Sequence, residues 1–258
     1  MKWIIDTSIN NGSEIKLISV LNSLNYDYKE FKYIPFMNHD DIIKDLNIDK
    51  NEKTICYGSI NFIQHIQKIK DLNPGSYANF EKFKCSYYYP ILEDILLNYP
   101  GILVEWKEFM GWTFNFHKPF FIRPDSGNKL FSGIVTNCNY LFSNIGLYLP
   151  GIEPNTKVLI SPYVEIEKEW RFFVSSNKVL TGSLYLKNNK HFEESIYDRE
   201  AYELALKVSE MISPDPIFSV DICKTKSGVY KVLELNSFSC AGLYLCDITK
   251  IVKFIEEI

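Results

Sequence analysis

Arginine is scarce in this sequence, and lysine supplies nearly all of its positive charge. Among 258 residues, only Arg123, Arg171 and Arg199 are arginines, and the formal net charge is −4. There is no basic tail and no long run of like charges. Broad binding of a nucleic-acid backbone needs a basic surface, so a nucleic-acid partner is not expected. Because lysine cannot imitate the planar fork of a guanidinium, each arginine is a candidate for a specific role.

Paired cysteine motifs, histidine clusters and long apolar runs are also missing. The six cysteines show no Cys-x-x-Cys spacing and the four histidines do not gather near them, which argues against a structural zinc site. No stretch approaches the ~20 apolar residues of a membrane-spanning helix. Residues 1–6 reach an acidic side chain too early for a targeting segment. We therefore expect a reduced, cytoplasmic protein with no membrane partner.

Strands and helices alternate over residues 1–84, which predicts a small α/β unit with a parallel sheet. Strands are expected at 3–6, 31–35 and 54–57, and helices at 14–24, 39–46 and 60–69. Gly58 and Ser59 follow the third strand, at the edge where such sheets bind ligands. A plain strand-to-helix turn is the alternative.

Turn residues at 73–76, near the end of this unit, and at 100–101, beyond it, break the chain. In the rest of the chain we expect a strand at 104–109, a short helix at 139–149 and an amphipathic helix at 198–211. The apolar stripe of the last of these helices predicts a core face.

A loop of small residues joins two strands between Arg123 and Lys129. The backbone N–H groups of such a loop can wrap phosphate groups, and the lysine places a positive charge on them. The loop is not Gly-x-x-x-x-Gly-Lys-Ser/Thr and no helix follows it, which excludes the P-loop of nucleoside triphosphatases. An ordinary hairpin is the alternative.

Residues 219–244 begin with two predicted strands joined by a tight turn at 226–228. Glu234 and Asn236 share one face of their strand, and pairing across the turn puts Asp221 opposite or diagonal to them. Two facing carboxylates repel unless a cation lies between them, and oxygen ligands suit Mg²⁺. The pattern therefore suggests a magnesium site, with a solvated acidic face as the alternative.

Two further strands carry candidate binding residues. The strand at 158–164 ends in Ser-Pro-Tyr-Val, where the proline fits a hinge or a sheet edge. In the strand at 169–174, Glu169 and Arg171 share a face because side chains alternate along a strand. Arg171 is either a binding group or a paired surface charge.

Taken in chain order, these segments resemble the ATP-grasp superfamily, over roughly residues 120–244. The resemblance implies an α+β / α/β protein in which two α+β subdomains, at 85–164 and 165–258, grip ATP. A small Rossmann-like α/β domain at 1–84 would precede them. The similarity is carried by the loop from Arg123 to Lys129, residues 160–164, Glu169-Trp170-Arg171, Asp221, Glu234-Leu235-Asn236 and Gly242-Leu243-Tyr244.

The similarity is closest to phage and bacterial ATP-grasp proteins whose last motif reads Glu-Leu-Asn and, a few residues later, Gly-Leu-Tyr. Two positions depart from the usual ATP-grasp pattern. Arg123 stands where most members have a lysine, and Pro162 replaces the acidic residue that commonly precedes the hinge aromatic.

The resemblance implies that Asp221, Glu234 and Asn236 hold Mg²⁺, or Mn²⁺, against the phosphates of ATP. Arg123 and Lys129 would bind those phosphates, with Lys129 in a loop that covers them.

The resemblance also implies a nucleotide site that includes Ser161, with backbone groups of Tyr163 and Val164 meeting adenine and Glu169 accepting from the ribose hydroxyls. Arg171 and Lys187, together with Arg123, would serve the transferred phosphoryl group or the activated substrate.

The implied reaction is ATP-dependent ligation, with release of ADP, of a carboxylate to an amine or a thiol through an acyl phosphate. The substrates would be small molecules, peptides or proteins. Two alternatives remain open: an ATP-binding regulator or adaptor with reduced chemistry, and a phosphotransferase that makes a stable phosphoester.

Overall fold

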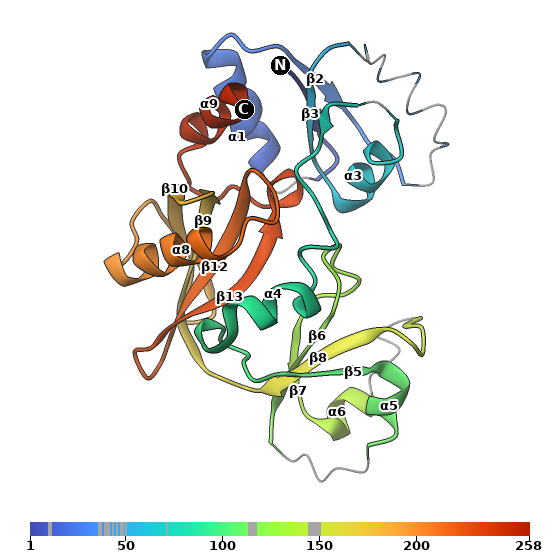
Figure 1. The fold of residues 1–258 in the computed structure, drawn as a ribbon, viewed down its shortest axis with the longest axis vertical. Coiled ribbons are helices and arrows are strands. Elements are labelled where there is room, and N and C mark those ends of the chain that lie inside the picture. Colours follow the sequence, from blue (N-terminus) through green and yellow to red (C-terminus); the bar gives the residue numbers. More distant parts are fainter. Residues whose placement is uncertain are drawn as a thin grey trace.

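A computed structural model describes residues 1–9, 12–35, 51–70, 72–112, 118–143 and 151–258, together with positions 38, 42, 44, 46 and 49. Three sheets follow one another along the chain (Figure 1). The first lies at the top of the view in Figure 1, the second at the bottom and the third between them. Most of the predicted helix at 39–46, and residues 144–149 of the helix expected at 139–149, lie outside the described residues.

The first sheet has the strand order β2-β1-β3-β4, and its paired strands are parallel, as the alternation predicts. Its second strand lies at 28–31, so the predicted bounds of 31–35 are wrong. Helix α1 (Ser13–Ser23) buries Leu17 and Leu21, and α3 (Ile60–Ile66) begins where the Ser59 hydroxyl accepts from the Phe62 N–H at 3.3 Å. The strands are β1 (Lys2–Asp6), β2 (Tyr28–Phe31), β3 (Thr54–Tyr57) and β4 (Pro74–Gly75).

Asp6 ties the ends of these strands together. Its buried carboxylate accepts hydrogen bonds from the N–H groups of Ser8, Tyr33 and Ser59 and from the Ser59 hydroxyl. Since the Ser59 side chain is used in this way and as the helix cap, the plain-turn alternative accounts for Gly58 and Ser59.

The second sheet is antiparallel, in the order β5-β8-β6-β7. Its strands are β5 (Ile102–Glu105), β6 (Phe120–Pro124), β7 (Ile134–Thr136) and β8 (Lys157–Pro162), and α6 (Cys138–Ser143) follows β7. The strand predicted at 104–109 is wrong beyond Glu105, because α5 (Trp106–Met110) begins there. Glu105 and Glu108 form a capping box, which supplies hydrogen-bond partners to the first turn of this helix.

The third sheet has the order β11-β10-β9-β12-β13 and is antiparallel. Helix α8 (Arg199–Met211) lies along it and buries Ala201, Ala205 and Val208, the core face that its sequence predicts. The strands are β9 (Ile166–Ser175), β10 (Lys178–Lys187), β11 (Lys190–Glu194), β12 (Phe218–Thr225) and β13 (Tyr230–Ser237).

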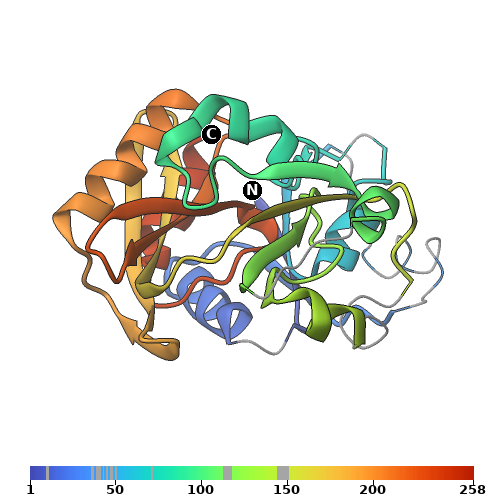
Figure 2. The same cartoon turned by 90° about the horizontal axis from the view of Figure 1, so that it is seen from below.

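Two helices cross between the units that sequence order suggests. Helix α4 (Cys85–Leu92), followed by the short η1 (Glu93–Ile95), shares one hydrophobic core with α8 and the third sheet (Figure 2). Helix α9 (Ile248–Glu257), which follows η2 (Phe238–Cys240), packs on α1 and buries Ile251 and Ile255 in a core with Trp3. The division at 84 and 164 therefore stays a prediction.

Candidate functional site

A central cavity of about 560 Å³ opens between the second and third sheets. Strand β6, the loop after it, the segment after β8 and strands β9, β10 and β13 supply its lining. Six of the residues singled out by the sequence line it, although more than a hundred positions separate the first from the last. They are Arg123, Lys129, Tyr163, Val164, Glu169 and Glu234.

The carboxylate of Glu234 is held by two cations from the opposite wall. Arg123 Nη2 lies 3.1 Å from Glu234 Oε2, and Lys129 Nζ lies 3.4 Å from Oε1. Burial alone would raise the pKa of Glu234, but Lys129 and Arg123 outweigh it and hold the pKa well below its usual range. The loop at 125–130, here called the lid loop, is thus tied electrostatically to the third sheet.

Asp221 is paired with Arg171 on the neighbouring strand. Arg171 Nε donates to Asp221 Oδ1 at 2.8 Å and Nη2 donates to Oδ2 at 2.6 Å, while Nη1 donates to the Gly242 carbonyl at 3.1 Å. Both side chains are almost fully buried. Arg171 is therefore a buried guanidinium held by three hydrogen bonds and not the surface charge that was the alternative.

The hairpin offers a donor set that fits Mg²⁺. Asp221 and Glu234 are direct partners in the register of β12 and β13, and Asn236 Nδ2 donates to both, at 3.3 and 3.0 Å. No cage of three Asp, Glu, His or Cys side chains forms in the part of the chain that the structure describes. Mg²⁺ does not need one, because it commonly takes one or two carboxylates and completes its shell with water and phosphate oxygens. Arg171, Arg123 and Lys129 now neutralise these carboxylates.

Tyr185 and Tyr244 form an aromatic pair that the sequence did not indicate. Their rings stack with centroids 4.6 Å apart, and Arg171 Cζ lies 5.7 and 5.1 Å from the two centroids. The Tyr185 hydroxyl donates to Glu169 Oε2 at 2.5 Å. Burial raises the pKa of Glu169, and this hydrogen bond opposes the rise. The pair restricts where Arg171 and Glu169 can lie.

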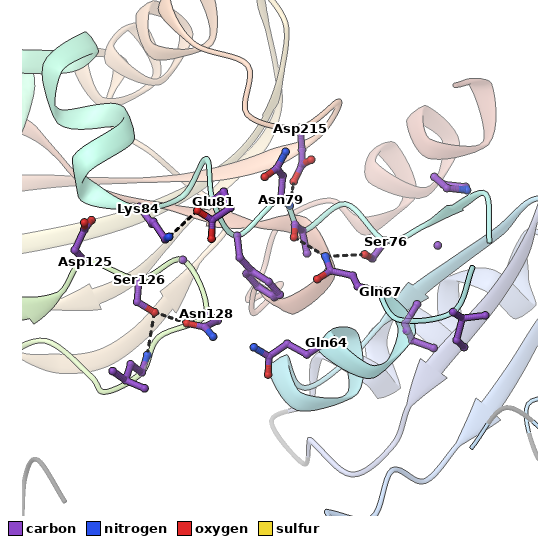
Figure 3. Close-up of a pocket in the computed structure, with 18 of the residues that line it drawn as sticks. Gln64, Gln67, Ser76, Asn79, Glu81, Lys84, Asp125, Ser126, Asn128 and Asp215 are labelled. Atoms are coloured by element: carbon purple, nitrogen blue, oxygen red, sulfur yellow. Dashed lines mark hydrogen bonds and ion pairs between the residues drawn. The ribbon is translucent and has the colours of Figure 1, made fainter. Parts of the chain in front are cut away.

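A larger rear cavity, of about 870 Å³, lies on the other side of the lid loop. Gln64, Gln67 and Ser76 from the first unit face Ser126 and Asn128 of the lid loop across it (Figure 3). Ser126 lines both the rear and the central cavity, so the lid loop is a thin partition between them. The rear cavity lacks Arg123 and Glu234, and the central cavity is therefore the better candidate site.

A family model described as "ATP-grasp domain, R2K clade family 2" matches residues 104–254, more than half of the chain. The protein belongs to the ATP-grasp family. The matched range includes β6, the lid loop, and the β12–β13 hairpin with Asp221, Glu234 and Asn236. No curated protein matches the sequence.

Solved structures show the same ATP-grasp fold at low sequence identity. The D-alanine–D-alanine ligase from Bacillus anthracis superimposes with a TM-score of 0.60 at 15% identity, over 99% of this chain and 96% of the ligase. A RimK domain ATP-grasp protein from Sphaerobacter thermophilus gives 0.62 at 9% identity, over 99% and 100% of the two chains. The D-cycloserine synthetase DcsG gives 0.62 at 10% identity, over 99% and 98%. These similarities establish the fold.

Two predicted site residues of the ATP-grasp pattern lie apart from the others. The Ser161 hydroxyl is buried and donates to Asn98 Oδ1 at 3.0 Å instead of lining the cavity. Lys187 is exposed at the end of β10, and its Nζ lies 5.3 Å from the centroid of the Phe192 ring.

Among the described residues, none of the helices combines the length and apolar character that crossing a bilayer would require.

Proposed function

We propose that this protein is an ATP- and Mg²⁺-dependent ligase that joins a carboxylate to an amine, or to a thiol, through an acyl phosphate. The observation that carries the proposal is the pairing of Glu234 with Arg123 and Lys129 across the central cavity. Arg123 and Lys129 can bind phosphate oxygens in place of the Glu234 carboxylate, because both groups are oxyanions that accept charge-assisted hydrogen bonds. ATP would enter between the two sheets, and its phosphates would then bind Arg123 and Lys129.

Each remaining wall of the cavity has a role in this proposal. Tyr163 and Val164, which follow β8 and line the cavity, would meet the adenine, and Glu169, beside Tyr185, would accept from the ribose hydroxyls. Asp221, Glu234 and Asn236 would hold Mg²⁺, which supplies positive charge to the phosphates when it is bound. Arg171 is the donor nearest to this hairpin on β9, where it could stabilise the transferred phosphoryl group. The exposed position of Lys187 gives no support to its predicted role.

In the proposed reaction, an oxygen of the substrate carboxylate attacks the γ-phosphorus while the bond from that phosphorus to the β–γ bridging oxygen breaks. ADP leaves with the electron pair. The amine then attacks the acyl carbon, inorganic phosphate departs and the nitrogen loses a proton. The protein positions the reactants and neutralises their charge, with Arg123, Lys129 and Arg171 as the basic groups.

The test is Mg²⁺-dependent ADP release in the presence of candidate carboxylates and amines. Glu234→Gln should lower the rate about 100-fold or more, because it removes a charge that acts on the metal and the phosphates. Glu210→Gln, on the exposed face of α8, is the matched control and should keep the full rate. Equal rates in the wild type and Glu234→Gln would refute the proposal.

A second candidate, an ATP-binding regulator without ligation chemistry, is favoured by one observation. Both oxygens of Asp221 are taken by Arg171, which leaves that carboxylate satisfied without a metal. The regulator would bind ATP with normal affinity and release no ADP with any carboxylate. The third candidate, a phosphotransferase, would produce ADP and a stable phosphoester. Mass spectrometry of the products would identify the phosphoester.

A further inference from the structure

A side cavity of about 320 Å³ adjoins the central cavity. Lys129 of the lid loop lines both, so a molecule in the side cavity reaches the basic group that faces Glu234. Its other walls come from α1, β9, β11 and the segment after β13. Residues far apart in the sequence thus enclose a space of small-molecule size beside the proposed phosphate site.

Basic side chains outnumber acidic ones in this cavity. Lys16, Lys129, Arg171 and His191 line it, while Glu193 is the single carboxylate among the described residues that do so. Arg171 and Lys129 are balanced by Asp221 and Glu234, which lie outside the cavity lining. Lys16 and His191 are different, because neither belongs to the phosphate-binding set.

Lys16 and His191 share one acidic partner. Lys16 Nζ lies 3.4 Å from Glu193 Oε2 and donates to the Tyr244 carbonyl at 2.8 Å. His191 Nε2 lies 3.1 Å from Glu193 Oε1. An ammonium group has three N–H donors, so Lys16 keeps one beyond these contacts, and the imidazole of His191 keeps its second ring nitrogen. Glu193 holds the two groups side by side.

We propose that the side cavity binds the phosphoryl-accepting substrate and that this substrate is a small dicarboxylate. One carboxylate would lie at the Lys129 end, where it meets the γ-phosphate, and the other would be bound by Lys16 and His191. The inference rests on the proposed function for the first carboxylate only. A substrate with an apolar tail would desolvate part of the Lys16 ammonium group and offer it no compensating charge.

The experiment measures binding by calorimetry, without turnover, in the presence of Mg²⁺ and a non-hydrolysable ATP analogue. Succinate and glutarate are the dicarboxylate probes, and propionate and butyrate are the monocarboxylate probes. Each dicarboxylate should bind about tenfold more tightly than its monocarboxylate counterpart. Lys16→Met and His191→Gln should each weaken dicarboxylate binding about tenfold and leave the affinity for the ATP analogue unchanged.

Lys190→Met is the matched control, because Lys190 is exposed next to His191 and does not line the cavity. The midpoint of thermal unfolding, measured for each variant, distinguishes a loss of binding from a loss of structure. The proposal is overturned if the wild type binds no dicarboxylate, if it binds both classes equally, or if both cavity variants bind as the wild type does. A wild type that binds the dicarboxylate but releases no ADP when ATP replaces the analogue would refute the ligase and leave the dicarboxylate-binding site of the side cavity standing.

Discussion

Arg171 and Asp221 face each other on the adjacent strands β9 and β12, and two short hydrogen bonds join the guanidinium to the carboxylate. The exposed fractions of the two residues are 5% and 1%, so both charges have been removed from water. Their mutual attraction offsets much of the free-energy cost of this desolvation, and the pair as a whole contributes little to the free energy of unfolding. The removal of one partner alone has a large effect, because the other is left buried and unpaired.

Asp221→Asn should therefore lower the free energy of unfolding by about 3 kcal/mol. Urea denaturation followed by circular dichroism measures this value. Replacing both partners together, as Arg171→Met with Asp221→Leu, should recover most of the loss, because no buried charge then remains unpaired. Recovery of stability without recovery of ADP release would separate the structural role of the pair from its proposed chemical one. An unchanged stability in Asp221→Asn would show that the pair is not buried as described.

Arg123→Ala should weaken the binding of an ATP analogue about 10- to 100-fold, because a charge-assisted donor to the phosphates is lost. Arg123→Lys should restore part of the affinity, since lysine keeps the charge but not the fork. Titration of a fluorescent ATP analogue measures both variants. Arg199→Ala, far along the chain on α8 and paired with Glu203 at the surface, is the control. If Arg123→Ala binds the analogue as well as the control does, Arg123 has no part in nucleotide binding.

Gly127→Ala should displace the lid loop. A Cβ at this position would collide with the carbonyl oxygen of Phe80, so one of the two backbone segments must shift. The expected cost is about 2 kcal/mol of stability, together with weaker nucleotide binding, because Lys129 would move with the loop. Gly111→Ala meets only an ordinary contact at 3.4 Å and serves as the control in the same unfolding and titration assays. Equal behaviour of the two variants would contradict the close approach of the lid loop to Phe80.

Asp215 predicts a pH dependence of stability with an unusual sign. Burial raises the pKa of its carboxyl to about 6, although the Asn79 N–H donates to Oδ2 at 2.9 Å. Since an unfolded aspartate has a pKa of about 4, the native state binds more protons between about pH 4 and pH 6. Stability should therefore fall by roughly 1–2 kcal/mol as the pH rises through this range.

Asp215→Asn should remove the share of that fall due to Asp215 and leave the share due to Glu169, whose pKa burial also raises; parallel denaturation curves at pH 4.5 and pH 7 test it. Glu234 does not interfere, because its lowered pKa confines its loss of stability to pH values below about 4. If the stability of the wild type and of Asp215→Asn changes by the same amount between pH 4.5 and pH 7, Asp215 is not the cause of the pH dependence.

Local pattern was enough to predict several features. The parallel sheet at 1–84 follows from the alternation of strands and helices, and the hairpin with Asp221 opposite Glu234 follows from side-chain alternation across a tight turn. The hairpin depends on residues close in sequence, and the parallel sheet on a local alternation of strands and helices that repeats along the chain. The spacing of Glu105 and Glu108 also fits a capping box, but the apolar residues 102–104 just before it favoured the prediction of a strand.

Long-range geometry could not be predicted in the same way. The sequence does not say that β9 lies next to β12, and this order is what brings Arg171 to Asp221. The stacking of Tyr185 on Tyr244 and the approach of Lys16 to Glu193 likewise join segments that only the folded chain brings together. Ser161 faces Asn98 because of the register of β8, which no local pattern specifies.

The packing of α9 on α1 has a consequence for how the protein is made. Trp3 and Leu17, near the start of the chain, share a core with Ile251 and Ile255, near its end. A nascent chain that emerges from a ribosome cannot complete this core until the last of these residues has been synthesised. The first unit must therefore wait, with part of its apolar surface exposed, until the residues of α9 have been synthesised. A truncation before Ile248 would leave that surface uncovered and open to aggregation.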